Sequence, residues 1–470
     1  MRGADAYFLR QESRAHHMHT LKIVVVDPSA AHATIDFERV RTGALHVLPH
    51  LPAFRLRPVN PVLGMGHHVW VEAPVLDPDY HFRHEVLPPD SEECALDELL
   101  SRIASEPLDP ERPLWQIVFV EGLPGGHIAY VTKIHHAVAD GNASAELVLR
   151  FFDEDPTGSE IPAAYEGTNE PIPSAMQRLV AMLRREIVRQ RHLPNVVWRS
   201  LVDLGAGLRS RLGGGPQPPR PFRSPETRFN LPLTPNRVVT HVTLPLPEMR
   251  RCKRVLGGTL NDVYLALVGG ALRTYLEQHG ELEPEPLSAA VPVAVRGPDD
   301  DPVFGNATAY WFATTGSDVA DPAERLRTVA ESTRAARALF EARDPRLPVD
   351  WLDFWILRRV YLNGLALAGR ALARRPTFNV IVSNVRGPAD PIFNDGAAVE
   401  ELYSMGPLAH QQGLNFTAWS YGDRFTVGIH ACREHVPDVR VLADALPIEL
   451  EKLAKSASSA ADREAAPPVA

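Results

Sequence analysis

The chain has 470 residues and a formal net charge of -9, with 44% hydrophobic and 23% charged residues. This is the composition of an ordinary globular protein with room for about two or three domains, and it excludes global disorder. The acidic balance also argues against whole-protein attraction to nucleic acid, so we expect no nucleic-acid partner.

The cysteine pattern and the chain start bear on the cellular compartment. Cys94, Cys252 and Cys432 form no CxxC pair and no disulfide framework, which fits a reducing compartment. The sequence shows no secretory signal and no run of about 18 apolar residues. We therefore expect a cytoplasmic protein and leave peripheral membrane attachment open.

Residues 1–155 read as one mixed α/β unit. Runs of β-branched residues bounded by Pro, Gly or Asp predict strands at 21–27, 66–75, 114–122 and 127–136. Apolar spacing predicts a helix at 95–105, and the stretch 142–155 also reads as a helix.

Residues 156–235 change character and are predicted to be a linker. Pro-, Gly- and Ser-rich stretches flank a basic segment at 175–212, part of which has the apolar spacing of an amphipathic helix. Two interpretations stay open: a helix that crosses between two lobes, or an interfacial helix that attracts anionic lipid.

A second α/β unit is predicted for residues 236–454. Its predicted elements are strands at 237–246, 288–295 and 378–385, a helix at 259–280, a hairpin at 414–431 and a closing helix at 438–454. The tail at 455–470 is predicted to be disordered.

The most informative stretch is "VTKIHHAVADGN" at 131–142. In a strand, alternate side chains point to opposite faces, so His135 and His136 are predicted to point in opposite directions. His136 lies where the strand ends, Asp140 follows in the turn, and Gly141 permits close approach of a ligand. Taken alone, the pair also fits one core and one surface histidine, while the cluster lacks the spacing of a zinc site, so we expect no metal.

"HHAVADG" is similar to the HHxxxDG signature of the CoA-dependent acyltransferase superfamily. More narrowly, the chain resembles the bacterial wax ester synthase/diacylglycerol acyltransferase family along nearly its whole length. The resemblance is carried by the ordered segments "DAYFLRQESRAHHMH", "LDPDYHFRHEVLP", "RPLWQIVFVEGL", "TLNDVYLA", "PVAVR", "GN" at 305–306, "VSNVRGP" and "VPD".

The resemblance implies a two-lobed α/β fold with mixed sheets, similar to chloramphenicol acetyltransferase, and a substrate tunnel between the lobes. It implies transfer of a fatty acyl group from acyl-CoA to a long-chain alcohol or diacylglycerol, with His136 as the general base. Histidine suits this step because one ring nitrogen is free near neutral pH. The chain has no GxSxG nucleophile elbow, so direct transfer is preferred over an acyl-enzyme.

The same resemblance gives Asp140 a mainly structural role through a buried salt bridge, for which Arg296 is the candidate partner. Thr259 and Asp262 nearly match a helix capping box, and Asn261 is a candidate donor toward the reacting carbonyl oxygen. In "VSNVRGP", either Asn384 and Gly387 line the tunnel or the segment only closes a strand.

No cofactor is expected beyond acyl-CoA as a co-substrate. The expected partners are acyl-CoA and a long-chain alcohol or diacylglycerol, with association to the inner face of the cell membrane or to lipid droplets left open. Two rival functions remain: a condensation-type enzyme that takes acyl groups from a carrier protein, and a non-catalytic lipid-binding protein of the same fold.

Overall fold

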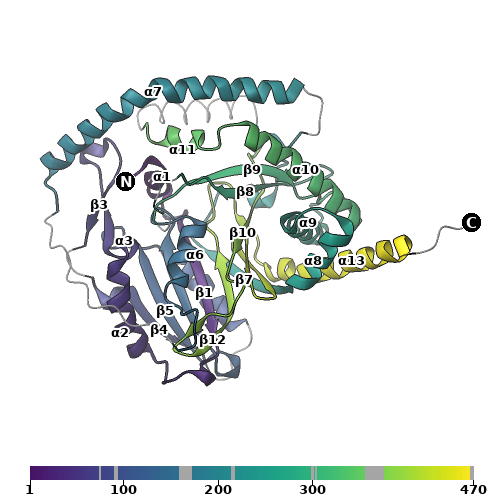
Figure 1. Ribbon diagram of the computed structural model, residues 1–470, viewed down its shortest axis with the longest axis horizontal. Helices are drawn as coiled ribbons and strands as arrows, with labels where there is room; N and C mark the ends of the chain where they lie inside the picture. The colour runs from purple at the N-terminus through teal and green to yellow at the C-terminus, as the bar shows by residue number, and fades with distance from the viewer. Residues whose placement is uncertain are drawn as a thin grey trace, which may run out of the picture.

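The computed structural model describes residues 1–73, 76–88, 94–157, 172–212, 217–297, 301, 304–354 and 375–465. Two six-stranded sheets lie side by side and carry helices on their faces (Figure 1). Each sheet contains both parallel and antiparallel neighbours, so the predicted mixed α/β architecture is confirmed.

The first sheet is built mainly from the N-terminal half. Its strands, in spatial order, are β11 (Phe393–Asn394), β12 (Ala397–Met405), β1 (His19–Val26), β6 (Ile128–His135), β5 (Trp115–Glu121) and β4 (Phe82–Val86). Apolar side chains alternate along β5 and β6, so both faces of the sheet pack against helices and bury separate cores.

The second sheet is built from the C-terminal half. Its strands, in spatial order, are β7 (Arg237–Pro245), β14 (Arg424–Cys432), β13 (Leu414–Tyr421), β10 (Val380–Arg386), β8 (Ser288–Ala294) and β9 (Thr308–Thr314). A small hairpin of β2 (Leu56–Val59) and β3 (Val69–Glu72) stands apart from both sheets.

One C-terminal segment crosses into the first sheet. Strand β12 pairs with β1 from Leu21 opposite Met405 to Val26 opposite Val399. The first sheet therefore contains strands from both sides of the predicted boundary at residue 236. This exchange of β12 connects the two lobes.

Helices pack around the two sheets (Figure 1). Their bounds are α1 (Gly3–Gln11), α2 (Phe37–Val47), α3 (Pro52–Arg55), α4 (Pro78–His81), α5 (Ala95–Ser105), α6 (Gly141–Leu149), α7 (Ala175–Leu212), α8 (Leu246–Leu256), α9 (Leu260–Gln278), α10 (Pro322–Ala342), α11 (Leu347–Leu352) and α13 (Arg440–Ala465). Among the described residues no single helix is both long and apolar enough to cross a bilayer; only α8 and α9 together reach that length, and they are bent by 102°.

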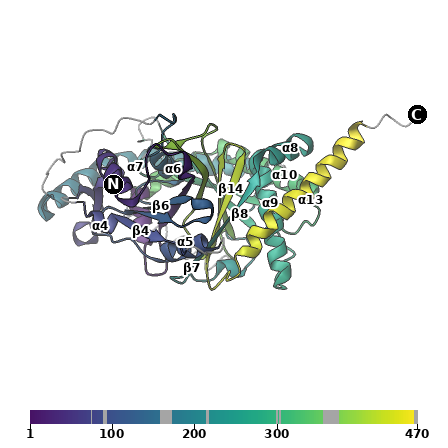
Figure 2. The same cartoon turned by 90° about the horizontal axis from the view of Figure 1, so that it is seen from below.

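Three predicted boundaries are wrong. The helix expected at 142–155 ends at Leu149, and the strand expected at 66–75 is only β3. The tail expected to be disordered from 455 continues α13 to Ala465, because Leu450, Leu453 and Ala457 remain buried against the C-terminal core; residues 466–470 lie outside the described residues. Figure 2 shows α13 running past α9 and beyond the body of the molecule.

Candidate active site

The histidine pair stands where β6 ends and the chain turns toward α6. The strand ends at His135, and the backbone N–H of His136 donates to the carbonyl of Met18, the residue before β1, at 2.6 Å. On the His135 face, Lys133 donates to the carbonyl of Ile103 at 2.9 Å. The opposite face places His136 beside the lobe interface, so the predicted divergence of the two histidines is confirmed.

The His136 ring is enclosed but lines a cavity. Only 8% of the residue is exposed, and the Phe8 ring of α1 stacks on the imidazole with centroids 4.4 Å apart. The cavity has a volume of about 270 Å³ and lies between β1, the start of α6 and strands β8, β9, β10 and β13. A fixed ring with access to a cavity is what a positioned base requires.

The partner of the ring is Asn306, which the sequence analysis quoted only as part of "GN". His136 Nδ1 lies 2.9 Å from Asn306 Oδ1. The Asn306 amide is oriented by its own Nδ2, which donates to the backbone carbonyl of His136 at 2.5 Å and faces the Asp5 carboxylate at 3.5 Å. Because Oδ1 can only accept, Nδ1 carries the imidazole proton and Nε2 keeps a free lone pair.

Burial sets the protonation state of this histidine. It lowers the pKa of His136 to about 4, although the Asp140 carboxylate and the Asn306 hydrogen bond act to raise it, and the Lys22 ammonium acts to lower it. The ring is therefore neutral at physiological pH. Burial also raises the pKa of Asp5, whose carboxylate accepts from the backbone N–H of Asn306 at 2.8 Å.

Asp140 holds the turn after His136. Its carboxylate caps α6 by accepting from the Ala143 N–H at 3.0 Å, and it accepts from Arg296 Nη2 at 2.7 Å and from the Ala307 N–H at 3.2 Å. The side chains of Asp140 and Arg296 are 2% and 16% exposed, so the predicted ion pair is present and largely buried. A buried pair of this kind fixes geometry because loss of one partner strands a charge.

The "GN" segment from the second lobe docks along this turn. Gly305 N–H donates to the carbonyl of Val138 at 2.6 Å, and Arg296 donates to the carbonyl of Gly305 at 2.8 Å. Gly305 has a φ of +80°, and a Cβ there would lie 2.7 Å from the Arg2 guanidinium, so both conformation and space favour glycine. The docking brings Asn306 beside His136.

His135 has different partners. Its Nδ1 accepts from the Ala137 N–H at 2.9 Å, which leaves Nε2 to donate to Glu12 Oε2 at 3.2 Å. The same Glu12 oxygen accepts from the Met18 N–H at 2.7 Å. Both ring nitrogens are thus used to hold the backbone, and neither is free to act as a base.

The remaining predicted residues divide into two groups. Gly141 and Asn384 line the His136 cavity. Asn261 and Asp262 do not line it: Asp262 forms a capping box with Thr259 and accepts from Thr333 at 2.6 Å. Gly387 also lies outside the cavity lining, and it is needed for packing, because a Cβ there would lie 2.2 Å from Ser420 O.

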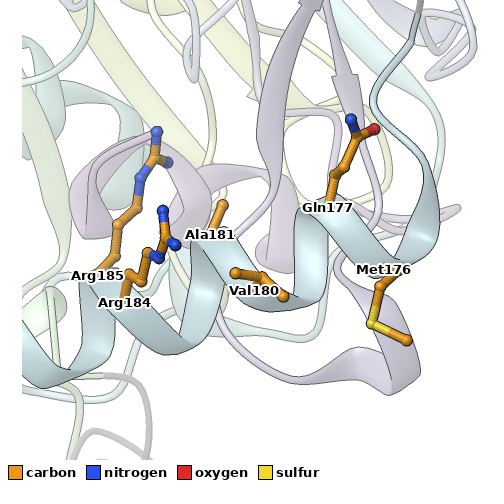
Figure 3. Close-up of a pocket in the computed structure, with 6 residues that line it drawn as sticks. All are labelled: Met176, Gln177, Val180, Ala181, Arg184 and Arg185. Carbon is orange, nitrogen blue, oxygen red and sulfur yellow. The ribbon is translucent and has the colours of Figure 1, made fainter.

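A separate hollow of about 470 Å³ lies against the first turns of α7, where Figure 3 shows Arg184 and Arg185 extending away from Met176. It offers no carboxylate or histidine to act as a base. Within the described ranges, one trio of possible metal ligands lies close together, Asp27, His127 and Glu400, and none of them lines the His136 cavity.

Comparison with known proteins agrees with this geometry. Residues 1–264 match the wax ester synthase/diacylglycerol acyltransferase catalytic domain, and residues 304–454 match the C-terminal domain of the same family. The chain belongs to the wax ester synthase/diacylglycerol acyltransferase family. It is an acyl-CoA-dependent O-acyltransferase, and the family resemblance seen in the sequence is confirmed.

Relatives cover almost the whole chain. Two Mycobacterium tuberculosis proteins named as diacylglycerol O-acyltransferases are 35% identical over 439 residues (92% of each chain) and 31% identical over 452 residues (96% of this chain, 89% of the other). The solved wax ester synthase/diacylglycerol acyltransferase from Marinobacter aquaeolei VT8 is 25% identical, covers 97% of this chain and 100% of its own, and superposes with a TM-score of 0.71. The first condensation domain of the calcium-dependent antibiotic synthetase shares the fold, with 18% identity over 97% of this chain and 96% of its own and a TM-score of 0.60.

Proposed function

We propose that this acyltransferase transfers a fatty acyl group directly from acyl-CoA to the hydroxyl of a long-chain alcohol or a diacylglycerol, with His136 as the general base. The products are a wax ester or triacylglycerol and free CoA. The observation that carries the proposal is the neutral imidazole whose Nδ1 is held by Asn306, which leaves Nε2 free at the cavity wall.

The chemical step follows from that tautomer. His136 Nε2 takes the acceptor's hydroxyl proton as the oxygen attacks the thioester carbonyl and the C–O bond forms. The carbonyl electrons move to oxygen and then return as the C–S bond breaks, and the imidazolium gives its proton to the leaving thiolate. A positioned base of this kind supplies about 10²–10⁴-fold in rate.

The start of α6 supports the transient negative charge. Gly141 and Asn142 line the cavity in the first turn of this helix, where backbone N–H groups have no intrahelical acceptor. Such N–H groups and the positive end of the helix dipole favour developing negative charge. The Ala143 N–H in the same turn is already used, because it donates to the Asp140 side chain.

The experiment is an assay of purified protein with palmitoyl-CoA and, in separate reactions, hexadecanol or diolein. Free CoA release together with a neutral lipid product is the expected result, and the acceptor panel decides between wax ester and triacylglycerol synthesis. Transfer only from an acylated carrier protein would instead support the condensation-type reaction, and lipid retention without turnover would support a non-catalytic binding protein.

We also propose that α7 brings the enzyme to the surface of the cell membrane or of lipid droplets. The helix spans from the β3 side of the molecule to α10 (Figure 1). Arg199 binds Asp344 and Asp350, and Arg343 binds Asp203, so one face of α7 is fixed to the protein. The outward face still exposes Trp198 at 66% and Leu201 at 59%. Apolar side chains among arginines are typical of helices that lie in a lipid interface.

The helix proposal is tested without deleting α7, because deletion would also remove its ion pairs. The double variant W198D/L201D should reduce co-sedimentation with vesicles containing anionic phosphatidylglycerol, while I448D, at an exposed position of α13, should not. Equal co-sedimentation of all three proteins would favour a purely bridging role. The free cysteines fit a reducing location, and we propose the cytoplasmic side of the membrane.

A further inference from the structure

A lysine lies in the wall of the His136 cavity. Lys22 is on β1, only 1% of it is exposed, and it lines the cavity together with Thr20 and His136. Its Nζ donates to Ser404 Oγ at 3.0 Å and lies 5.5 Å from the centre of the Trp419 ring. An ammonium has three donors, so this position leaves donors for a ligand in the cavity.

No carboxylate of the described residues forms an ion pair with this ammonium. Asp140 is the acid that lines the same cavity, and its oxygens are taken by Arg296 and by two backbone N–H groups. Burial accordingly lowers the pKa of Lys22 to about 7, with the Asp140 carboxylate acting in the opposite direction. A buried charge without a counter-ion is costly, so a negative group entering the cavity would gain a strong interaction.

A second buried lysine shows what a purely structural role looks like. Lys133, on the opposite face of the same sheet, donates to the carbonyls of Ile103 and Glu106 and lines no cavity with His136. Those two carbonyls take two of its three donors within the protein. In place of two carbonyls, the Lys22 ammonium has the Ser404 hydroxyl and the face of the Trp419 ring. Its remaining donors lie in the wall of the His136 cavity, which also contains Ser383 and Asn415.

We propose that Lys22 extends the acceptor range beyond neutral alcohols and diacylglycerols: it favours a long-chain acceptor that carries an anionic oxygen group, a carboxylate or a phosphate, close to the hydroxyl that is acylated. The inference rests on the proposed function, because the hydroxyl must reach His136 while the anion reaches Lys22. Lys22 also acts on the base, because its charge lowers the pKa of His136. An anion that neutralises Lys22 therefore strengthens the base at the moment when the acceptor binds.

The test uses matched acceptors with palmitoyl-CoA as donor. One pair is 3-hydroxyhexadecanoate and its methyl ester, and the other is 1-oleoyl-lysophosphatidate and 1-monooleoylglycerol, so the two arms separate carboxylate from phosphate. We expect the wild-type kcat/KM to be at least about tenfold higher for the anionic member of one pair. In K22M this ratio should fall at least about tenfold, whereas K253M, at an exposed position of α8, should keep the wild-type ratio.

Two kinetic outcomes overturn the proposal: a wild-type preference for the neutral member of both pairs, or a K22M variant that loses kcat equally on every acceptor. The latter would assign Lys22 to the transition state rather than to the headgroup. If no acceptor releases CoA, the proposed function fails first. Calorimetric titration of 3-hydroxyhexadecanoate and of lysophosphatidate then tests the anion site by itself, where equal affinity of wild type and K22M for both ligands overturns it.

Discussion

His135 and His136 are adjacent and of one residue type, yet the structure uses them in opposite ways. Both nitrogens of the His135 ring are occupied, one by the Ala137 N–H and the other by Glu12. His136 has one nitrogen held by Asn306 and the other free at the cavity. The difference lies in the partners, since both side chains are more than nine-tenths buried.

The comparison shows that the hydrogen bonds of the ring decide the role of a histidine. A ring with both nitrogens bound is a structural link, whereas a ring with one nitrogen free can act as a base. Asn306 can only accept at Oδ1, so it holds the proton on Nδ1 and leaves Nε2 basic. Variants of the two histidines and of the residues that hold His136 test this comparison, beginning with His136 itself.

The largest effect is expected for H136A. Without the ring no base reaches the acceptor hydroxyl, so kcat should fall by about 10²–10⁴-fold. Loss of the Phe8 stack and of the Asn306 hydrogen bond should cost only about 1–3 kcal/mol in the free energy of unfolding, so the protein stays folded. Steady-state CoA release and thermal unfolding measure the two quantities. An H136A enzyme with wild-type activity would remove the mechanism.

The next effect is expected for D140A, which leaves Arg296 without its buried partner. The loss of the ion pair, of the α6 cap and of the Ala307 contact should cost roughly 3–5 kcal/mol in the free energy of unfolding. Activity should fall as well, because the turn that follows His136 loosens. The double variant D140L/R296M, which removes both charges, should be less destabilised than D140A. A loss of activity with unchanged stability would contradict the proposed structural role.

Local patterns in the sequence were sufficient to predict α5 at 95–105, β5 to within one residue at each end, and the hairpin that β13 and β14 form, because apolar spacing and turn residues act within a few positions. Strand β12 was not predicted. It contains Glu400 and Glu401, which interrupt the apolar pattern, and its partner β1 lies near the other end of the chain, where Leu21 stands opposite Met405. The pairing of β12 with β1 depends on contacts between distant parts of the chain, so no short stretch of the sequence predicts it.

The site shows the same limit. The sequence indicated His136 and Asp140 because the HHxxxDG motif marks them, and the family resemblance pointed to Arg296 as the partner of Asp140. Asn306 carried one usable signal, the preceding Gly305, but its contact with His136 spans 170 positions. Asn261 illustrates the reverse error, since a polar residue at a helix start resembles an oxyanion donor, but this helix start does not line the His136 cavity.

The third prediction concerns the acid side of the pH profile. Protonated His136 cannot act as a base, and its pKa of about 4 predicts a kcat/KM that stays level from pH 7 down to about 5 and then falls. In N306D a carboxylate beside Nδ1 favours the imidazolium, so this fall should move about 1–3 pH units upward. The double variant D5N/N306D avoids a clash with the buried Asp5 carboxylate and should show the same displacement. A profile unchanged in both variants would mean that residue 306 does not control the ring.

The smallest catalytic effect is expected for H135A, the histidine whose nitrogens are both bound. Removing its ring leaves the Ala137 N–H and the Glu12 carboxylate with fewer partners, which should cost about 1–3 kcal/mol in the free energy of unfolding. Glu12 still accepts from the Met18 N–H, so the strand beside His136 keeps one support and kcat should stay within about tenfold of the wild type. The acid limb of H135A should also stay near that of the wild type, because Asn306 still holds His136. A loss of kcat as large as that of H136A, in a protein of unchanged stability, would show that the two histidines act as one catalytic unit.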